Sequence, residues 1–153
     1  MIDILTAMET ELYKDIIEAS EVAYTSIVER NSYYTKENVH RGPVCHMAAS
    51  ILLKHLRSIG YPAFQEKRTV NSGGHSYVVV DNQVVEILGD PTWQQFVSYN
   101  PRVVRPRVLV GTRDQVIEQA LGFGMHVSHA GFWKPSPIRL IRKPSLATVD
   151  QKE

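Results

Sequence analysis

The chain has 153 residues, which is enough for one domain with its own hydrophobic core, and its composition is typical of a globular protein. Its 17 basic and 16 acidic residues nearly balance, which argues against nucleic acid or an anionic membrane as a partner. The single cysteine excludes an internal disulfide and a zinc site built on paired thiolates.

The N-terminal residues favour a protein without a signal peptide. Residues 1–5 include an early acid and no basic segment ahead of an apolar stretch, and no apolar run in the chain approaches the length of a membrane span. We therefore expect a cytoplasmic protein. Secretion without a cleavable signal would leave no mark in the sequence.

The first predicted element is an amphipathic helix over about residues 3–30, either continuous or broken near Ser20. Its apolar side chains recur every three or four positions. They are Leu5, Met8, Leu12, Ile16, Ala19, Ala23 and Ile27. We interpret this segment as a scaffold helix that covers the core.

The segment from Arg41 to Gly60 predicts a second helix, with Pro43 at its first position and Gly60 just beyond its end. An apolar stripe at helical spacing predicts its buried side. The stripe consists of Cys45, Ala49, Leu52, Leu56 and Ile59. The only cysteine would thus point inward from the first turn, where the helix dipole and unpaired N–H groups favour a thiolate. A lone cysteine is also a common small core residue, so its neighbours must decide its role.

After Gly60 the spacing becomes alternating, which predicts three antiparallel strands. They cover residues 61–70, 75–80 and 83–88, with residues 71–74 as a flexible loop and residues 81–82 as a two-residue turn. A small sheet should therefore follow the cysteine helix.

The two-residue turn leads to a prediction about His75. It places Val80 opposite Gln83 and His75 opposite Leu88, so that Asp90 lies diagonally next to His75 on the same face. A histidine and an aspartate so placed can share a hydrogen bond. A turn with one residue more would put them on opposite faces.

The rest of the chain predicts smaller elements. Residues 91–96 favour a turn or short helix, and residues 100–110, rich in proline and arginine, favour an edge strand or an extended surface segment. Thr112 and Gln115 form a capping-box pattern for a last helix that ends near Gly122 or Gly124. We expect one domain over residues 1–133 and a tail over residues 134–153, ordered only where it docks.

One face of the predicted sheet is mostly apolar and must be covered. It carries His75, Tyr77, Val79, Val84, Leu88 and Asp90. The cysteine helix is the nearest apolar partner in sequence, and its packing there would bring the sulfur to the imidazole. Cys45 would then attack a carbonyl carbon, His75 would move the proton, and Asp90 would orient the imidazole. The backbone N–H of Cys45 is one candidate oxyanion donor.

Further candidates surround this predicted triad. Tyr33, Tyr34 or Asn38, in the loop before the cysteine helix, could supply a second oxyanion donor or line a cleft. Trp93 and Trp133 are expected in the core or in a cleft wall, and Trp93 could shield the histidine and aspartate from water. Glu86 shares the face of His75 and could replace Asp90 as the orienting acid.

Other histidines and basic residues favour ordinary roles. His46 follows Cys45 directly, but consecutive helix positions point about 100° apart, so it is a poor general base. Cys45, His46 and His75, or His126 and His129, lack the paired spacing of a zinc site, and we expect neither metal nor cofactor. The arginines at 102, 105 and 107 favour a solvated segment over a nucleic-acid site.

From Arg41 to Phe96 the sequence resembles the transglutaminase-like branch of the papain-like cysteine enzymes. The resemblance rests on the cysteine at a helix start, then Gly74-His75-Ser76-Tyr77-Val78-Val79-Val80 as a strand and Gly89-Asp90-Pro91-Thr92-Trp93 closing the next. It implies a catalytic triad in the order Cys, His, Asp and acyl transfer through a thioester. In that family this chemistry serves peptide cleavage, glutamine deamidation or amide exchange with an amine.

The sequence thus predicts an α+β domain with a papain-like core, in which a buried cysteine helix packs on an antiparallel sheet between flanking helices. The expected function is that of a thiol-dependent hydrolase or acyltransferase. Its substrate would be a protein or peptide, or a small amide or acyl compound. The alternative is a non-catalytic binding module of the same fold that holds a protein partner through the cleft or the Arg102–Arg107 segment.

Overall fold

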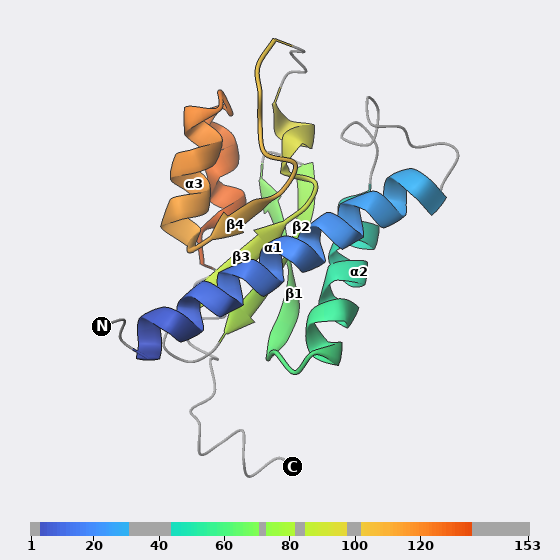
Figure 1. The fold of residues 1–153 in the computed structure, drawn as a ribbon. Coiled ribbons are helices and arrows are strands. Elements are labelled where there is room, and N and C mark those ends of the chain that lie inside the picture. Colours follow the sequence, from blue (N-terminus) through green and yellow to red (C-terminus); the bar gives the residue numbers. More distant parts are fainter. Residues whose placement is uncertain (1–3, 31–43, 71–72, 82–84, 98–101, 136–153) are drawn as a thin grey trace.

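The computed structural model describes residues 4–30, 44–70, 73–81, 85–97 and 102–135. It confirms the α+β class: four antiparallel strands in the order β1-β2-β3-β4 have helices on both faces (Figure 1). The elements are α1 Ile4–Arg30, α2 Cys45–Ser58, β1 Ala63–Val70, β2 Gly73–Asp81, β3 Glu86–Asp90, η1 Trp93–Phe96, β4 Leu109–Gly111, α3 Arg113–Gly122 and η2 Val127–Trp133. The two η elements are 3₁₀ helices.

α1 is a continuous helix of 27 residues, so the alternative with a break near Ser20 is wrong. The predicted stripe is buried from Leu12 onward, through Ile16, Ala19, Ala23 and Ile27. Ser20 lies fully buried within the same helix. A serine in a helix therefore marks no break here, because the apolar stripe continues through it.

α2 begins at Cys45, with Val44 as its N-cap residue, and Pro43 lies outside the described residues. Gly60 follows the end as predicted, with a φ of +98° that favours glycine. The Gly60 N–H donates to the Arg57 carbonyl and the Tyr61 N–H to the Leu56 carbonyl, which is a Schellman ending. The predicted stripe is wrong at Ile59, which is 49% exposed because the chain has already left the helix there.

The connection between β2 and β3 is longer than predicted. Asp81 belongs to β2 and pairs with Glu86, so residues 82–85 connect the two strands and the two-residue turn is wrong. Val80 lies opposite Ile87 rather than Gln83, four residues further along the chain. An even shift leaves the alternation of faces unchanged, so His75 and Asp90 stay on a common face.

The two faces of the sheet are covered by different helices. α1 and α2 pack on the face that carries Val78, Val80 and Ile87. α3 and η2 pack on the other face, against Tyr77 and Val79. The prediction that the cysteine helix covers the His75 face is therefore wrong. Aromatic residues of η2, a segment for which the sequence predicted no element, occupy that face instead.

The remaining elements agree in part with the predictions. β4 is a short edge strand that pairs with β3, whereas residues 102–108 form no strand. The capping box at α3 is present: Thr112 Oγ1 accepts from the Gln115 N–H, and Gln115 Oε1 accepts from the Thr112 N–H. Most of the predicted tail, residues 136–153, lies outside the described residues. None of the helices described is both long enough and apolar enough to cross a membrane.

Candidate active site

Four elements meet at one end of the sheet, the upper end in Figure 1. Neighbouring antiparallel strands run in opposite directions, so the start of β2 and the end of β3 share that end. α2 begins there as well, and η1 follows directly after β3. This arrangement brings Cys45, His75 and Asp90 to the same place.

His75 and Asp90 form a fully buried pair. His75 Nε2 lies 2.5 Å from Asp90 Oδ2, and both side chains are 0% exposed. The same Oδ2 accepts from Trp133 Nε1–H at 2.8 Å, and Oδ1 accepts from the Thr92 N–H at 3.2 Å. The predicted contact between His75 and Asp90 is present, and two further donors hold the carboxylate in one orientation.

Cys45 lies next to this pair and is 4% exposed. Burial alone would raise the pKa of its thiol. A hydrogen bond with His75 and the charge of His75 oppose that effect, and hydrogen bonds from the Ser76 backbone and the Gln95 side chain add to them. The net result is a pKa below that of an ordinary thiol, so the site favours the thiolate.

The pKa of His75 moves in the opposite direction. Burial is the largest single effect and opposes the charged ring, but the charge and hydrogen bond of Asp90 together with those of Cys45 outweigh it and raise the pKa of His75 to about 9. A thiol with a lowered pKa beside an imidazole with a raised pKa favours the thiolate–imidazolium ion pair. That pair is the reactive form of a cysteine nucleophile.

Cys45 comes from the α2 side of the sheet and His75 from the other side. They meet because the ladder between β2 and β3 ends at Val78 and Gly89, so β2 continues beyond the last paired residue of β3. At Ser76 the β2 backbone is therefore able to bond to the Cys45 sulfur. The thiol reaches the imidazole at the end of the sheet rather than across its face.

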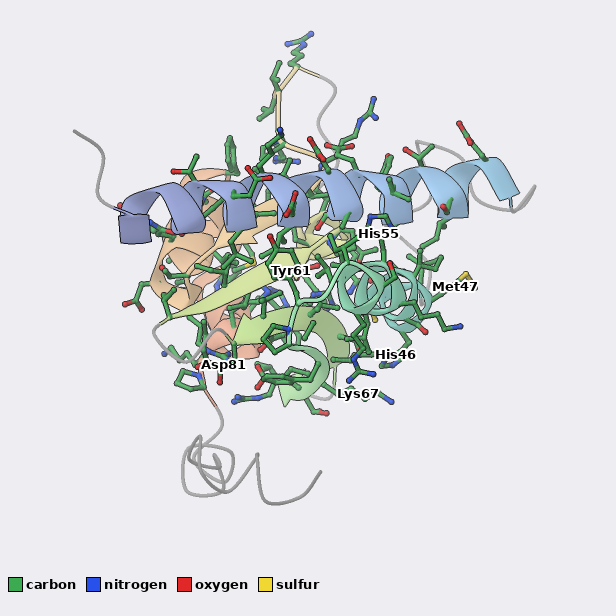
Figure 2. All side chains as sticks on the ribbon, turned by 60° about the horizontal axis from the view of Figure 1, so that its bottom comes forward. His46, Met47, His55, Tyr61, Lys67 and Asp81 are labelled. Carbon is green, nitrogen blue, oxygen red and sulfur yellow. The ribbon has the colours of Figure 1, made fainter. Side chains whose placement is uncertain are left out.

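His46 connects the same two elements. Its Nδ1 contacts Ser76 Oγ, and Ser76 is fully buried. In Figure 2 His46 lies on the side of α2 toward Lys67, which is the β1 partner of Ser76, and Met47 lies on the outer side of the helix. His46 thus ties the first turn of α2 to β2, which is a structural role.

Aromatic rings enclose the imidazole. Phe96 meets it edge-on with centroids 4.7 Å apart, and Phe132 and Trp133 follow at 5.4 Å and 6.3 Å. These rings keep water from the His75–Asp90 pair and so strengthen its electrostatic interaction.

A second polar cluster lies on the same face and fixes η2. Arg113 donates to Glu66 at 2.8 Å and to the Trp133 carbonyl at 3.0 Å. The Tyr77 hydroxyl contacts Glu66 and lies 2.5 Å from the Phe132 carbonyl oxygen. The cluster holds the two η2 residues whose rings adjoin His75.

Glu86 belongs to this cluster, because its Oε2 lies 3.4 Å from Arg113 Nη2. The acid that contacts His75 is Asp90. The alternative of Glu86 as the orienting acid is therefore wrong.

The other candidates lie elsewhere. Tyr33, Tyr34 and Asn38 are outside the described residues. Trp93 is fully buried, and its indole N–H donates to the Pro106 carbonyl at 3.0 Å. The indole that contacts Asp90 is that of Trp133.

Sequence reasoning gave Trp133 no role beyond the core or a cleft wall, and it did not single out Gln95. Gln95 Nε2 lies 2.8 Å from His75 Nδ1. Its place in the short element after Asp90 was the available signal. For Trp133 no periodic pattern pointed to the fold of residues 127–133.

Within the described ranges, no three or more His, Cys, Asp or Glu side chains gather in a way that could hold a metal ion. Of the arginines before β4, Arg107 lies 3.8 Å from Glu21 and stacks over the Tyr24 ring at 5.6 Å. That arginine therefore packs on α1.

Comparison with protein-family models, curated proteins and solved structures finds no match to this chain.

Proposed function

We propose that this chain is a cysteine hydrolase or acyltransferase with a papain-like core of the transglutaminase-like type. The observation that carries the proposal is the connected series Asp90–His75–Cys45 at one end of the sheet, with the pKa of the thiol lowered and that of the imidazole raised. A buried cysteine with a structural role alone needs no such partner series.

The residue roles follow from the geometry. His75 Nε2 is committed to Asp90, so His75 Nδ1 is the nitrogen that takes the thiol proton. Asp90 keeps the ring oriented and stabilises its charge, while Thr92 and Trp133 hold the carboxylate. Cys45 then attacks the carbonyl carbon of an amide or related acyl group and forms a thioester. Water or an amine would release the acyl group.

The test uses p-nitrophenyl acetate as an activated acyl donor. The wild-type chain should release one rapid equivalent of p-nitrophenolate and gain one acetyl group by mass spectrometry. Cys45→Ala should abolish both signals. Asp90→Asn, which leaves the shape of the carboxylate but changes the histidine tautomer, should slow acylation by about 100- to 10,000-fold. Full acylation of Cys45→Ala would contradict the proposal.

The pH dependence of iodoacetamide labelling separates the enzyme from a non-catalytic binding module. We expect labelling of Cys45 to persist well below the pH at which an ordinary thiol titrates, because the pKa of Cys45 is lowered. Labelling that follows a free thiol, near pH 8.5, would favour the module. The exposed segment before β4, where Val104 is 92% exposed, would then be the part to examine for partner binding.

A further inference from the structure

We propose that Gln95 is a catalytic residue whose side-chain N–H donates to the oxyanion that forms when Cys45 attacks its substrate. The proposal rests on the function proposed above. Gln95 lies in η1, and its Nε2 is 2.8 Å from His75 Nδ1. The same side chain forms a hydrogen bond with the Cys45 thiol. The amide nitrogen thus adjoins both reacting groups.

The partner of this amide depends on the protonation state of His75. An amide nitrogen only donates, so His75 Nδ1 accepts from Gln95 while the imidazole is neutral and carries its proton on Nε2, toward Asp90. In the thiolate–imidazolium form, which the lowered pKa of Cys45 and the raised pKa of His75 favour, Nδ1 carries the proton and donates, so it no longer accepts the Gln95 N–H. The released N–H is then available to a negative charge beside the sulfur.

Exposure indicates that substrate meets Gln95. Cys45 is 4% exposed, and His75 and Asp90 are 0% exposed. Gln95 is partly exposed. Among these four residues Gln95 has the most access to solvent, and we infer that an acyl group approaching the sulfur meets its side chain.

η1 holds this donor in place before substrate binds. Trp93 Nε1 and Gln94 Nε2 both donate to the Pro106 carbonyl, at 3.0 Å and 2.9 Å. Phe96 packs edge-on against the His75 ring. The residues on either side of Gln95 are thus fixed, so the backbone that carries the amide does not have to move when the oxyanion forms.

The reaction with an amide substrate proceeds as follows. The Cys45 thiolate forms a C–S bond with the carbonyl carbon, and the carbonyl π pair moves to oxygen, where the Cys45 N–H and the Gln95 N–H stabilise it. The pair returns as the C–N bond breaks, and the leaving amine takes the proton from His75 Nδ1. Water or an amine then attacks the thioester and gives its proton to Nδ1, and the sulfur leaves as thiolate.

Gln95→Met tests the proposal, because methionine has a similar volume and no donor. Two reactions of Cys45 are compared on their high-pH plateaus. Acylation by p-nitrophenyl acetate forms an oxyanion, whereas alkylation by iodoacetamide displaces iodide and forms none. We expect acylation to fall by about 100- to 1000-fold and alkylation to change by less than about threefold. Gln119→Met, an exposed glutamine on α3, is the matched control and should leave both rates unchanged.

Two outcomes would overturn the proposal. Equal losses in both reactions would show that Gln95 acts only through the thiol and imidazole, and unchanged rates would show that it has no role. Either result requires a wild-type chain that forms the acetyl-enzyme on Cys45. Absence of that acetyl-enzyme in the wild-type chain would instead contradict the proposed function itself and the Gln95 proposal with it.

Discussion

The two faces of the sheet are built differently, although both are well buried. On the face under α1 and α2, aliphatic side chains of the sheet such as Val78 pack against aliphatic side chains of the helices such as Leu52. The face under α3 and η2 combines large aromatic rings with His75, Asp90, Glu66 and Arg113 in hydrogen-bonded sets. The stability of the first face depends on how completely side chains fill its volume, and that of the second depends on every polar group keeping its hydrogen-bond partner. The two faces should therefore respond to different kinds of substitution.

The largest effect is expected on the polar face. Arg113→Leu leaves Glu66 as a buried carboxylate without its cation and removes a donor from the Trp133 carbonyl. Breaking a buried pair on one side costs about 3–5 kcal/mol. The free energy of unfolding in urea should fall by that amount.

A second variant shows whether the loss comes from the unpaired charge. In Glu66→Gln/Arg113→Leu the side chain at position 66 is neutral and only the less buried Glu86 keeps a charge, so at least half of the lost stability should return. A double variant no more stable than Arg113→Leu would mean that the cluster contributes by its shape and not by charge pairing.

The next largest effect concerns pH and the His75–Asp90 pair. In Cys45→Ala the charge and hydrogen bond of Asp90 still favour the protonated ring, and we expect the pKa of His75 to remain raised. Below about pH 6.5 the histidine is protonated in both states, and the stabilisation is complete. As pH rises toward the folded pKa, the unfolded chain loses its proton first. The free energy of unfolding then falls by up to about 1.4 kcal/mol per pH unit.

In this variant the pH range over which the free energy of unfolding falls should end below pH 9, since Cys45 itself contributes to the raised pKa of His75. The wild-type curve should be flatter, because the lowered pKa of Cys45 has the opposite effect on stability. Urea unfolding at several pH values measures these slopes, with Cys45→Ala/His75→Gln as the reference. Parallel curves for the single and double variants would exclude a raised pKa at His75.

The smallest effect is expected on the aliphatic face, at Gly89. A Cβ at this position would lie 2.8 Å from Ile16 Cγ2, 3.0 Å from Ser20 Oγ and 3.2 Å from Leu52 Cδ2. Gly89→Ala would thus push α1 away from the sheet, and overpacking of this kind costs about 1–3 kcal/mol.

The matched control is Gly122→Ala. Gly122 ends α3, and a Cβ there meets no atom within 4 Å. Alanine should be neutral at this position or stabilise the helix by up to about 1 kcal/mol. Equal effects of the two substitutions on urea unfolding would contradict the close approach of α1 to β3.

The alternation of side chains along β2 and β3 was enough to predict that His75 and Asp90 share a face. An error of an even number of residues in the strand register leaves every side chain on its predicted face. It was not enough to predict which helix covers that face. Both α2 and η2 are apolar, and the preference for η2 arises from Phe132 and Trp133, which join the face only through tertiary packing. Local patterns do not carry that information.

The candidate site shows the same limit. Cys45 at a helix start and the Asp90-Pro91-Thr92 segment were recognisable from local sequence. Gln95 and Trp133 contact His75 and Asp90 across 20 and 43 residues of chain. Contacts of that range depend on how η1 and η2 return to the sheet, and no spacing rule covers them.

The Cys45 thiol and its two partners belong to different layers, and Ser76 on the strand that carries His75 contacts both Cys45 and His46 in the first turn of α2. A slide of α2 by one or two ångströms would separate sulfur from imidazole while leaving the aromatic layer whole. If Cys45 is the nucleophile that we propose, its reactivity depends on how the two layers pack, and it should disappear on gentle warming before the chain loses its secondary structure.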